Sequence, residues 1–242
     1  MSIILGHRGA SGHAPENTLE AFKLAMDMGA EGFELDVHLS KDGELVVIHD
    51  ETVDRTTDGK GLVCEKTVAE LKALDACNKM EAYRGAKIPT LREVYELILD
   101  TDHIVNVEIK TDDIFYPQIE EKCLALEAEM GMKGRIVYSS FNHYTTRKVR
   151  ELAPDAQIGM LFGDVLVEPY DYCKSVGANL LHPNKANLNV PGFAEKAKEA
   201  GLGINVWTVN TEDYMQKCLD CGAGIVTNYP DIAVKLRAAQ KK

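Results

Sequence analysis

The chain has 242 residues, 45% of them hydrophobic, a length that suits two small domains or one α/β barrel of roughly 250 residues. Its 27 Lys and Arg against 38 Asp and Glu give a net charge of −11 at pH 7. A surface this negative excludes long-range attraction of nucleic acid or anionic lipid, so a phosphate-containing ligand needs a local cationic pocket or a metal.

Short β-rich runs alternate with amphipathic helical stretches along the chain. The β-rich runs span residues 3–7, 32–38, 104–110, 135–141, 157–162, 179–182, 203–208 and 224–227. Asn17 and Thr90, each with a glutamate three residues later, are predicted to be the N-caps of helices. Eight strands separated by helices predict a closed parallel (β/α)8 TIM barrel of the α/β class, and no glycine-rich dinucleotide motif supports an open sheet.

One further β-rich run, residues 44–49, breaks this alternation. An Asp-Gly pair at 42–43 precedes it and is typical of a tight β-hairpin turn. A hairpin folded about this pair places Asp36 opposite about residue 48. His49 is therefore expected to lie beside Glu34 and Asp36.

The segment that follows the hairpin, residues 50–88, is polar and contains glycines, with a short helical piece at 67–74. It is predicted to be an insertion over the mouth of the barrel, where a lid or a substrate-selecting surface would lie. On this interpretation residues 1–242 form one TIM-barrel domain.

Acidic side chains on two neighbouring strands are predicted to converge at the mouth. Residues two apart in a strand share a face, so Glu34 and Asp36 point the same way, and the pair Glu108 and Lys110 repeats the pattern. Buried carboxylates must be paired or bind a metal, and three of them suit a hard cation such as Mg²⁺ or Ca²⁺. The structural alternative is that the two glutamates only form salt bridges with Arg8 and Lys110.

His7 and His49 are the predicted proton-transfer groups. His7, Arg8 and Gly9 close the first strand at its C-terminal end, the face where barrel enzymes keep their active sites. Histidine titrates near neutral pH and can act as acid or base. Arg8 offers a planar fork for phosphate oxygens, and Lys110 offers a point charge for the same group.

Four other residues are secondary candidates. Trp207 and Phe141 end strand-like runs and are either core residues or the walls of a pocket for a glycerol or apolar group. His182 also ends such a run, which allows a supporting role. His38 shares the parity of Glu34, but the hairpin turn is expected to carry it outward.

The motifs resemble those of the glycerophosphodiester phosphodiesterase family, among the phospholipase-C-like barrels, over nearly the whole chain. They are H-R-G at 7–9, P-E-N-T at 15–18, E-L-D-V at 34–37, S-K-D-G-E-L-V-V-I-H-D at 40–50, P-T-L at 89–91, E-I-K at 108–110, W-T-V-N at 207–210 and T-N-Y-P-D at 227–231. H-R-G alone would be a weak signal, whereas the full set in this order is specific.

The resemblance implies hydrolysis of a small-molecule glycerophosphodiester to sn-glycerol 3-phosphate and an alcohol, with a divalent metal as cofactor. It places the metal ligands at Glu34, Asp36 and Glu108, the acid and base at His7 and His49, phosphate contacts at Arg8 and Lys110, and pocket aromatics at Trp207 and Phe141. Two pathways stay open: attack by the neighbouring glycerol hydroxyl through a cyclic phosphate, which two histidines favour, or direct attack by water.

Two rival functions share this fold. A phospholipase or lysophospholipase D would need an apolar rim or membrane-binding loop, and the polar segment 50–88 does not supply one. A catalytically silent barrel would lack a histidine or a ligand, and none is missing here.

The start of the chain bears on location. The first fourteen residues hold only three consecutive strongly apolar residues, at 3–5, and no run is long enough to span a membrane. Six scattered cysteines fit reduced thiols. We therefore expect a cytoplasmic enzyme like the cytoplasmic bacterial family members. The preferred head group, the physiological metal and the choice between monomer and homo-oligomer are not determined by the sequence.

Overall fold

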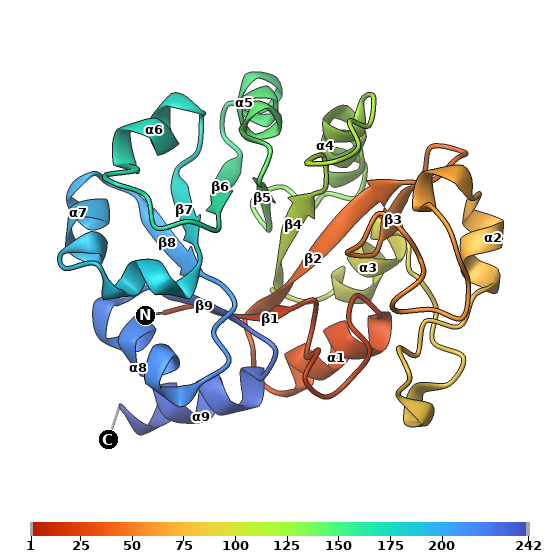
Figure 1. The fold of residues 1–242 in the computed structure, drawn as a ribbon, viewed down its shortest axis with the longest axis horizontal. Coiled ribbons are helices and arrows are strands. Elements are labelled where there is room, and N and C mark those ends of the chain that lie inside the picture. The colour runs from red at the N-terminus through yellow and green to blue at the C-terminus, as the bar shows by residue number, and fades with distance from the viewer. Residues whose placement is uncertain (1, 241–242) are drawn as a thin grey trace.

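A closed barrel of eight parallel strands forms the centre of the computed structural model, which describes residues 2–240 (Figure 1). Each strand is hydrogen-bonded to its neighbours in the order β1-β9-β8-β7-β6-β5-β4-β2, and the pairing of β1 with β2 closes the ring. The strands are β1 Ile4–His7, β2 Gly32–Leu39, β3 Leu45–Val47, β4 Ile104–Ile109, β5 Ile136–Ser140, β6 Gln157–Phe162, β7 Leu180–Pro183, β8 Gly203–Val206 and β9 Gly224–Thr227. The predicted (β/α)8 TIM barrel is confirmed, with β3 as an added strand.

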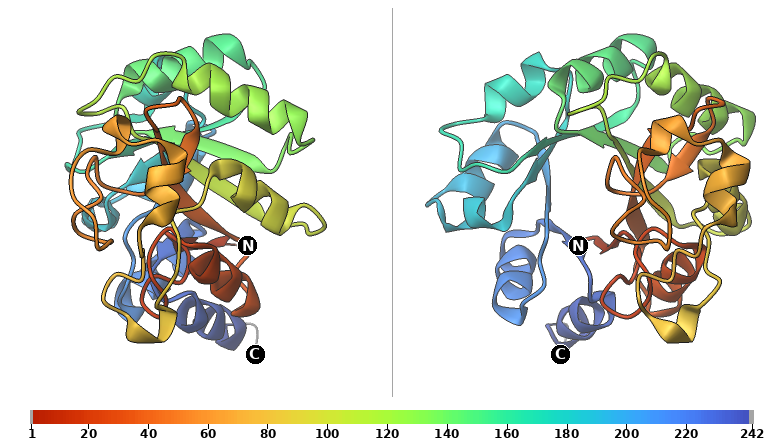
Figure 2. Two further views of the ribbon diagram at one scale, coloured as in Figure 1. Left: turned by 90° about the vertical axis from the view of Figure 1, so that its right-hand side faces the viewer. Right: turned by 45° about the vertical axis from the view of Figure 1, so that its right-hand side comes forward.

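Helices surround the barrel on its outer side (Figures 1 and 2). They are α1 Leu19–Asp27, α2 Val68–Ala73, α3 Leu91–Ile98, α4 Ile119–Glu129, α5 His143–Leu152, α6 Tyr170–Ser175, α7 Phe193–Glu199, α8 Glu212–Cys221 and α9 Pro230–Ala239. Short 3₁₀ turns lie at Val63–Glu65, Glu81–Tyr83 and Lys185–Asn189. None of the helices in this described part of the chain has the length and apolar character needed to cross a membrane.

The two predicted N-caps have different outcomes. Thr90 caps α3 and, with Glu93, forms a complete capping box, as predicted. The prediction for Asn17 is wrong, because Thr18 caps α1 and accepts a hydrogen bond from the backbone N–H of Ala21. Asn17 instead takes a left-handed backbone conformation with φ of 57° and donates its side-chain amide to Asp36 at 2.8 Å. The residue therefore serves the barrel mouth and not the helix.

Alternate residues of β2 face opposite layers, as their parity predicts. Phe33, Leu35 and Val37 are fully buried in the main apolar cluster between the barrel and its helices. Phe33 stacks on Phe22 of α1 with ring centroids 4.4 Å apart. The intervening acids, Glu34 among them, are left to point into the barrel, where polar chemistry can be built.

The hairpin strand β3 lies on the same edge of β2 as β1. β1 pairs with residues 32–34 of β2, and β3 pairs antiparallel with Val37–Leu39, while β4 occupies the opposite edge. The backbone N–H of Ile48 also bonds the carbonyl of Asp36 at 3.1 Å, so the predicted register is confirmed. β3 therefore extends the barrel wall beyond the end of β1.

The segment after β3 wraps beside the hairpin at the edge of the barrel (Figure 1). It contains two of the 3₁₀ turns and α2, the helical piece predicted at 67–74. Its apolar side chains share one small cluster with the hairpin: Val46 and Ile48 pack with Val53, Val63, Leu71, Ala76 and Ile88. This shared cluster holds the segment against the barrel mouth.

Candidate active site

A cavity opens at the C-terminal ends of the barrel strands. Seven of the nine predicted site residues line it: His7, Arg8, Glu34, His49, Glu108, Phe141 and Trp207. The other two, Asp36 and Lys110, contact members of this set directly. The barrel therefore brings together side chains that lie as much as 200 positions apart in the sequence.

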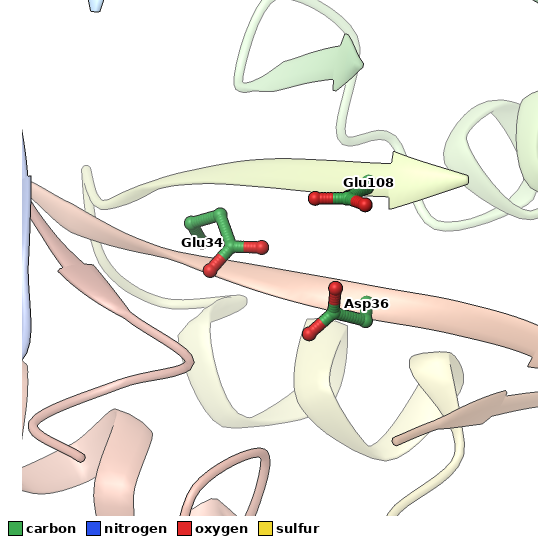
Figure 3. Close-up of side chains that lie close together, drawn as sticks. All are labelled: Glu34, Asp36 and Glu108. Carbon is green, nitrogen blue, oxygen red and sulfur yellow. The ribbon is translucent and has the colours of Figure 1, made fainter. Parts of the chain in front are cut away.

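Three buried carboxylates meet between β2 and β4 (Figure 3). Asp36 and Glu108 are register partners on these strands, and Glu34 lies two residues earlier on the same face of β2. One oxygen of each carboxylate lies within 4.8 Å of the other two. The buried Oδ1 of Asp36 has no hydrogen-bond partner among the residues that the structure describes. Oxygen ligands at this spacing, one of them unsatisfied, fit a divalent hard cation.

The charges of these acids repel one another inside the protein. Burial raises the pKa of Glu34 well above its usual value, and the neighbouring carboxylates raise it further. Burial and the charge of Asp36 raise the pKa of Glu108 to about 7. Burial acts on Asp36 in the same direction, but Arg8 and other nearby basic groups outweigh it, so its pKa is lowered. These pKa shifts reflect a concentration of negative charge that a bound metal would neutralise.

The contacts of Lys110 bear on the alternative that the glutamates only form salt bridges. Its Nζ lies 3.0 Å from Glu108 and 3.3 Å from Asp112. Burial lowers the pKa of the ammonium group, but the charges of the neighbouring acids outweigh burial and raise it. Glu34 takes part in no ion pair between described side chains. Salt bridging therefore explains one of the two glutamates and leaves the other without a cation.

Arg8 is held at the mouth by acids on several sides. Its guanidinium contacts Glu16 at 2.8 Å and approaches Asp36 at 3.5 Å, while its backbone N–H donates to Glu34 at 2.9 Å. Gly9 follows with φ of 79°, and a side chain there would collide with the backbone of α1. The absence of a side chain at Gly9 therefore allows the close approach of α1.

His7 has a fixed partner and a lowered pKa. Its Nδ1 lies 2.7 Å from Oδ1 of Asn228, so the Nδ1–H tautomer leaves Nε2 free to accept a proton. Dense packing around the ring, with the adjacent Arg8 charge, lowers its pKa to about 4. His7 is therefore neutral at physiological pH. Asn228 lies in the motif at 227–231 but was not among the residues predicted for the site.

His49 arrives at the cavity from the end of the hairpin. Its Nδ1 lies 2.6 Å from Oδ1 of Asp50, and its backbone carbonyl accepts a hydrogen bond from Nε2 of His38 at 3.0 Å. The expectation that His38 points outward is wrong, because this ring is fully buried and also bonds Tyr116. The turn begins only after β2 ends at Leu39, so His38 is still inside the sheet and supports the hairpin.

Two aromatic rings form one wall of the cavity. Phe141 and Trp207 pack edge to face with centroids 5.3 Å apart, and Nζ of Lys110 lies 5.9 Å from the Phe141 centroid. Nε1 of Trp207 donates to the carbonyl of His182 at 2.7 Å. Burial lowers the pKa of His182 to about 3, so this ring is a neutral hydrogen-bonding group in the wall.

An ion-pair chain next to His49 was not predicted from the sequence. Arg55 of the segment 50–88 forms two-pronged contacts with both Asp50 and Glu16. Glu16 and Asp50 lie inside motifs quoted above, so their positions carried a signal. Arg55 carried none, because its partners are five and 39 residues away along an irregular path.

Exposed apolar side chains occur outside the segment 50–88. Phe115, Val165 and Val167 lie in the loops after β4 and β6, and Tyr144 and Tyr172 lie in the first turns of α5 and α6; each is between 48% and 93% exposed. In a barrel these loops surround the mouth. These residues are therefore candidates for the apolar rim that the segment 50–88 does not supply.

Comparison with known proteins gives a consistent family. Residues 7–232 match the sequence model described as "Glycerophosphoryl diester phosphodiesterase family". A glycerophosphodiester phosphodiesterase of Caldanaerobacter subterraneus subsp. tengcongensis is 46% identical over 97% of this chain and 97% of its own length. One from Bacillus altitudinis is 40% identical over the full length of both proteins.

Solved structures similar to this chain come from the same family. The glycerophosphodiester phosphodiesterase from Agrobacterium tumefaciens superimposes with a TM-score of 0.86 at 32% identity, covering 97% of this chain and 100% of that one. An Oleispira antarctica phosphodiesterase in complex with the product sn-glycerol-3-phosphate also has a TM-score of 0.86, at 31% identity, covering 100% of this chain and 98% of that one.

Proposed function

Because the chain belongs to the glycerophosphoryl diester phosphodiesterase family, we propose that it hydrolyses glycerophosphodiesters to sn-glycerol 3-phosphate and an alcohol, with a divalent cation and two histidines. The observation that carries this proposal is the cluster of Glu34, Asp36 and Glu108 in a cavity that His7 and His49 also line. The product bound in the Oleispira antarctica structure supports the substrate class. We further propose that the barrel and the segment 50–88 act as one catalytic domain.

Mg²⁺ or Ca²⁺ is the proposed cofactor, held by the three carboxylates. The unsatisfied Oδ1 of Asp36 and the raised pKa values of Glu34 and Glu108 are the features that fit such an ion. When bound, it supplies positive charge that stabilises the negative charge on phosphate oxygens. The absence of cysteine and histidine from the cluster favours these hard cations over zinc.

The two histidines divide the proton transfers in this proposal. His7 is neutral at physiological pH and has a free Nε2, so it suits the base that takes the proton of the attacking hydroxyl. His49, held through Nδ1 by Asp50, then protonates the leaving oxygen from its other nitrogen. Arg8 and Lys110 hold the phosphate oxygens by charge and hydrogen bonds.

The aromatic wall is proposed to hold the glycerol end of the substrate. Phe141 and Trp207 present carbon surface to the cavity, and the ring of Phe141 lies beside the ammonium group of Lys110. A carbon backbone can pack on these rings while its phosphate reaches the lysine. This arrangement would fix the glycerol hydroxyl next to phosphorus.

Attack by that neighbouring hydroxyl, through a cyclic phosphate, is the pathway we propose. Two histidines fit it because their acid and base roles can reverse when water opens the ring. A substrate analogue that lacks the hydroxyl should therefore react at least about a hundredfold more slowly, as expected when a positioned nucleophile is lost. Steady-state kinetics of glycerophosphocholine and its deoxy analogue measure this ratio. Equal rates would show that water attacks directly.

The reaction itself is tested by release of sn-glycerol 3-phosphate, measured with a coupled assay on glycerophosphocholine and glycerophosphoethanolamine. We expect release with Mg²⁺ or Ca²⁺ and none with EDTA, because the acids lack their counter-charge without a cation. Restoring the metal to the chelated protein should restore the activity. Activity that persists in EDTA would contradict the metal requirement, and inactivity on every head group would contradict the proposed substrate class.

A second candidate function is hydrolysis of lysophospholipids by the same site. The exposed apolar residues on the loops after β4 and β6 favour it, since they would contact an acyl chain at the mouth. The same assay series distinguishes the two, with lysophosphatidylcholine run beside glycerophosphocholine. A higher kcat/KM for the lysolipid, lost when Val167 and Phe115 are replaced with serine, would assign the enzyme to lipids.

A further inference from the structure

We propose that Arg55 is a positioning residue for His49, fixing the histidine through Asp50 and taking its own position from Glu16. The segment 50–88 would then complete the catalytic site and not only cover it. The inference rests on the proposed function, because its effect is measured on phosphodiester hydrolysis.

The contact between Arg55 and Asp50 fixes the carboxylate that His49 uses. Nε of Arg55 lies 2.7 Å from Oδ2 of Asp50 and Nη2 lies 2.9 Å from Oδ1. The same Oδ1 is 2.6 Å from Nδ1 of His49. A two-pronged contact sets the plane of the carboxylate, and that plane in turn sets the direction of the imidazole. The hydrogen bond from Arg55 also lowers the pKa of Asp50, so the group stays an anion at working pH.

Glu16 ties the other side of the guanidinium to the barrel. Nη1 of Arg55 lies 2.7 Å from Oε2 of Glu16 and Nη2 lies 2.8 Å from Oε1, the oxygen that also contacts Arg8. Glu16 lies in the loop between β1 and α1, and only 13% of its side chain is exposed. An ordered chain thus runs from Arg8 through Glu16, Arg55 and Asp50 to His49. It joins the loop after β1, the segment 50–88 and the hairpin end.

The other arginine of this segment, Arg84, does not share this arrangement. Arg84 pairs with Glu81 three residues earlier on the surface, a contact that stabilises little. All three nitrogens of the Arg55 guanidinium are used, and both acceptors hold a predicted site residue. Arg55 does not line the cavity, and its guanidinium contacts Asp50 and Glu16, so we expect any effect on catalysis to pass through these two partners.

The decisive measurement is a double-mutant cycle. Arg55→Met removes the charge and the fork while keeping the length of the side chain, and Arg84→Met is the matched control in the same segment. We expect Arg55→Met to lower kcat about tenfold, the range for a group that orients an active-site histidine, with KM changed less than about twofold. In the His49→Ala background the same substitution should lower kcat less than about threefold, because its target is gone. Arg84→Met should leave kcat unchanged in both backgrounds.

Equal losses in both backgrounds would overturn the inference, because they would show that Arg55 does not act through His49. An unchanged kcat in Arg55→Met would overturn it as well. If Arg55→Met unfolds, as judged by thermal unfolding, Arg55→Lys takes its place. Lysine keeps the charge but loses the fork, and we expect a loss of about threefold in kcat that vanishes in the His49→Ala background.

Failure of the proposed function would look different. The parent enzyme would then release no sn-glycerol 3-phosphate, or His49→Ala alone would have no effect on the rate. An active parent that is impaired by His49→Ala but indifferent to Arg55→Met would refute the role of Arg55 alone.

Discussion

Replacing His49 with alanine, or His7 with alanine, should lower kcat/KM for glycerophosphocholine at least about a hundredfold, the usual contribution of a positioned acid or base. Both rings line the cavity, and each is held through Nδ1 by a partner side chain that leaves Nε2 available. The loss should fall mainly on kcat, because proton transfer and not binding is removed. Steady-state kinetics at saturating metal measure it.

His143 provides a matched control for both substitutions. It is a partly buried histidine of α5 whose ring bonds Tyr172 and the carbonyl of Leu161, and it does not line the cavity. We expect His143→Ala to keep kcat/KM within about threefold. A change below about fivefold in His7→Ala or His49→Ala would refute the role assigned to that histidine.

Glu108→Gln should have opposite effects on activity and on stability. With Mg²⁺ present, the activity should fall at least about a hundredfold, because a charged ligand is lost from the cluster. In EDTA the same variant should be more stable than the parent above pH 7. Burial and Asp36 raise the pKa of Glu108 from 4.5 to about 7, so the native state of the parent holds a proton that the unfolded state releases.

The sign of the pH effect follows from this difference. Between pH 4.5 and 7 the native parent binds more protons than the unfolded chain, so its stability falls as the pH rises. The variant has no carboxyl group at this position and escapes that loss. Its advantage in the free energy of unfolding should therefore grow by a value on the order of 3 kcal/mol from pH 4.5 to about 8. Urea unfolding in EDTA at the two pH values measures the difference.

A second buried carboxylate controls for the substitution itself. Glu120 contacts Lys148 at 3.0 Å and Thr145 at 3.1 Å, away from the cavity. Glu120→Gln should keep the activity and lower the stability, because it breaks an ion pair. If Glu108→Gln behaved in the same way, the acids would form a structural network and not a metal site.

Much of this site could be predicted because it is built on strands. Alternation along β2 separates Glu34 from Phe33, and an Asp-Gly turn places residue 48 opposite Asp36, the register that the structure confirms. These rules are local, so a single sequence contains them. Closure of the barrel then brings the ends of distant strands together, so no long-range contact has to be predicted separately.

The features that could not be predicted depend on irregular backbone or on unrelated segments. Asn17 was predicted to be a helix cap from the residues next to it in the sequence. Its left-handed backbone conformation, which turns the amide toward Asp36, has no signal in those residues. His38 was misplaced because it was the last residue of the predicted strand, whereas β2 continues to Leu39 and the turn begins only after it. Arg55 meets Glu16 only because the segment 50–88 folds back over the mouth, a path that no periodic pattern describes.

The shared edge of β2 has a consequence for how this sequence can vary. Through β1, His7 is the register partner of Glu34, and the hairpin pairs the run before His49 with the same strand. Pairing with β2 therefore sets the positions of both histidines relative to Glu34 and Asp36. A length change of one residue in the turn at 40–43 would move His49 to the opposite face of the strand. In the segment 50–88, no strand alternation between two faces fixes the number of residues. Family members can therefore be expected to differ widely in the length of that segment while holding the short turn before it constant.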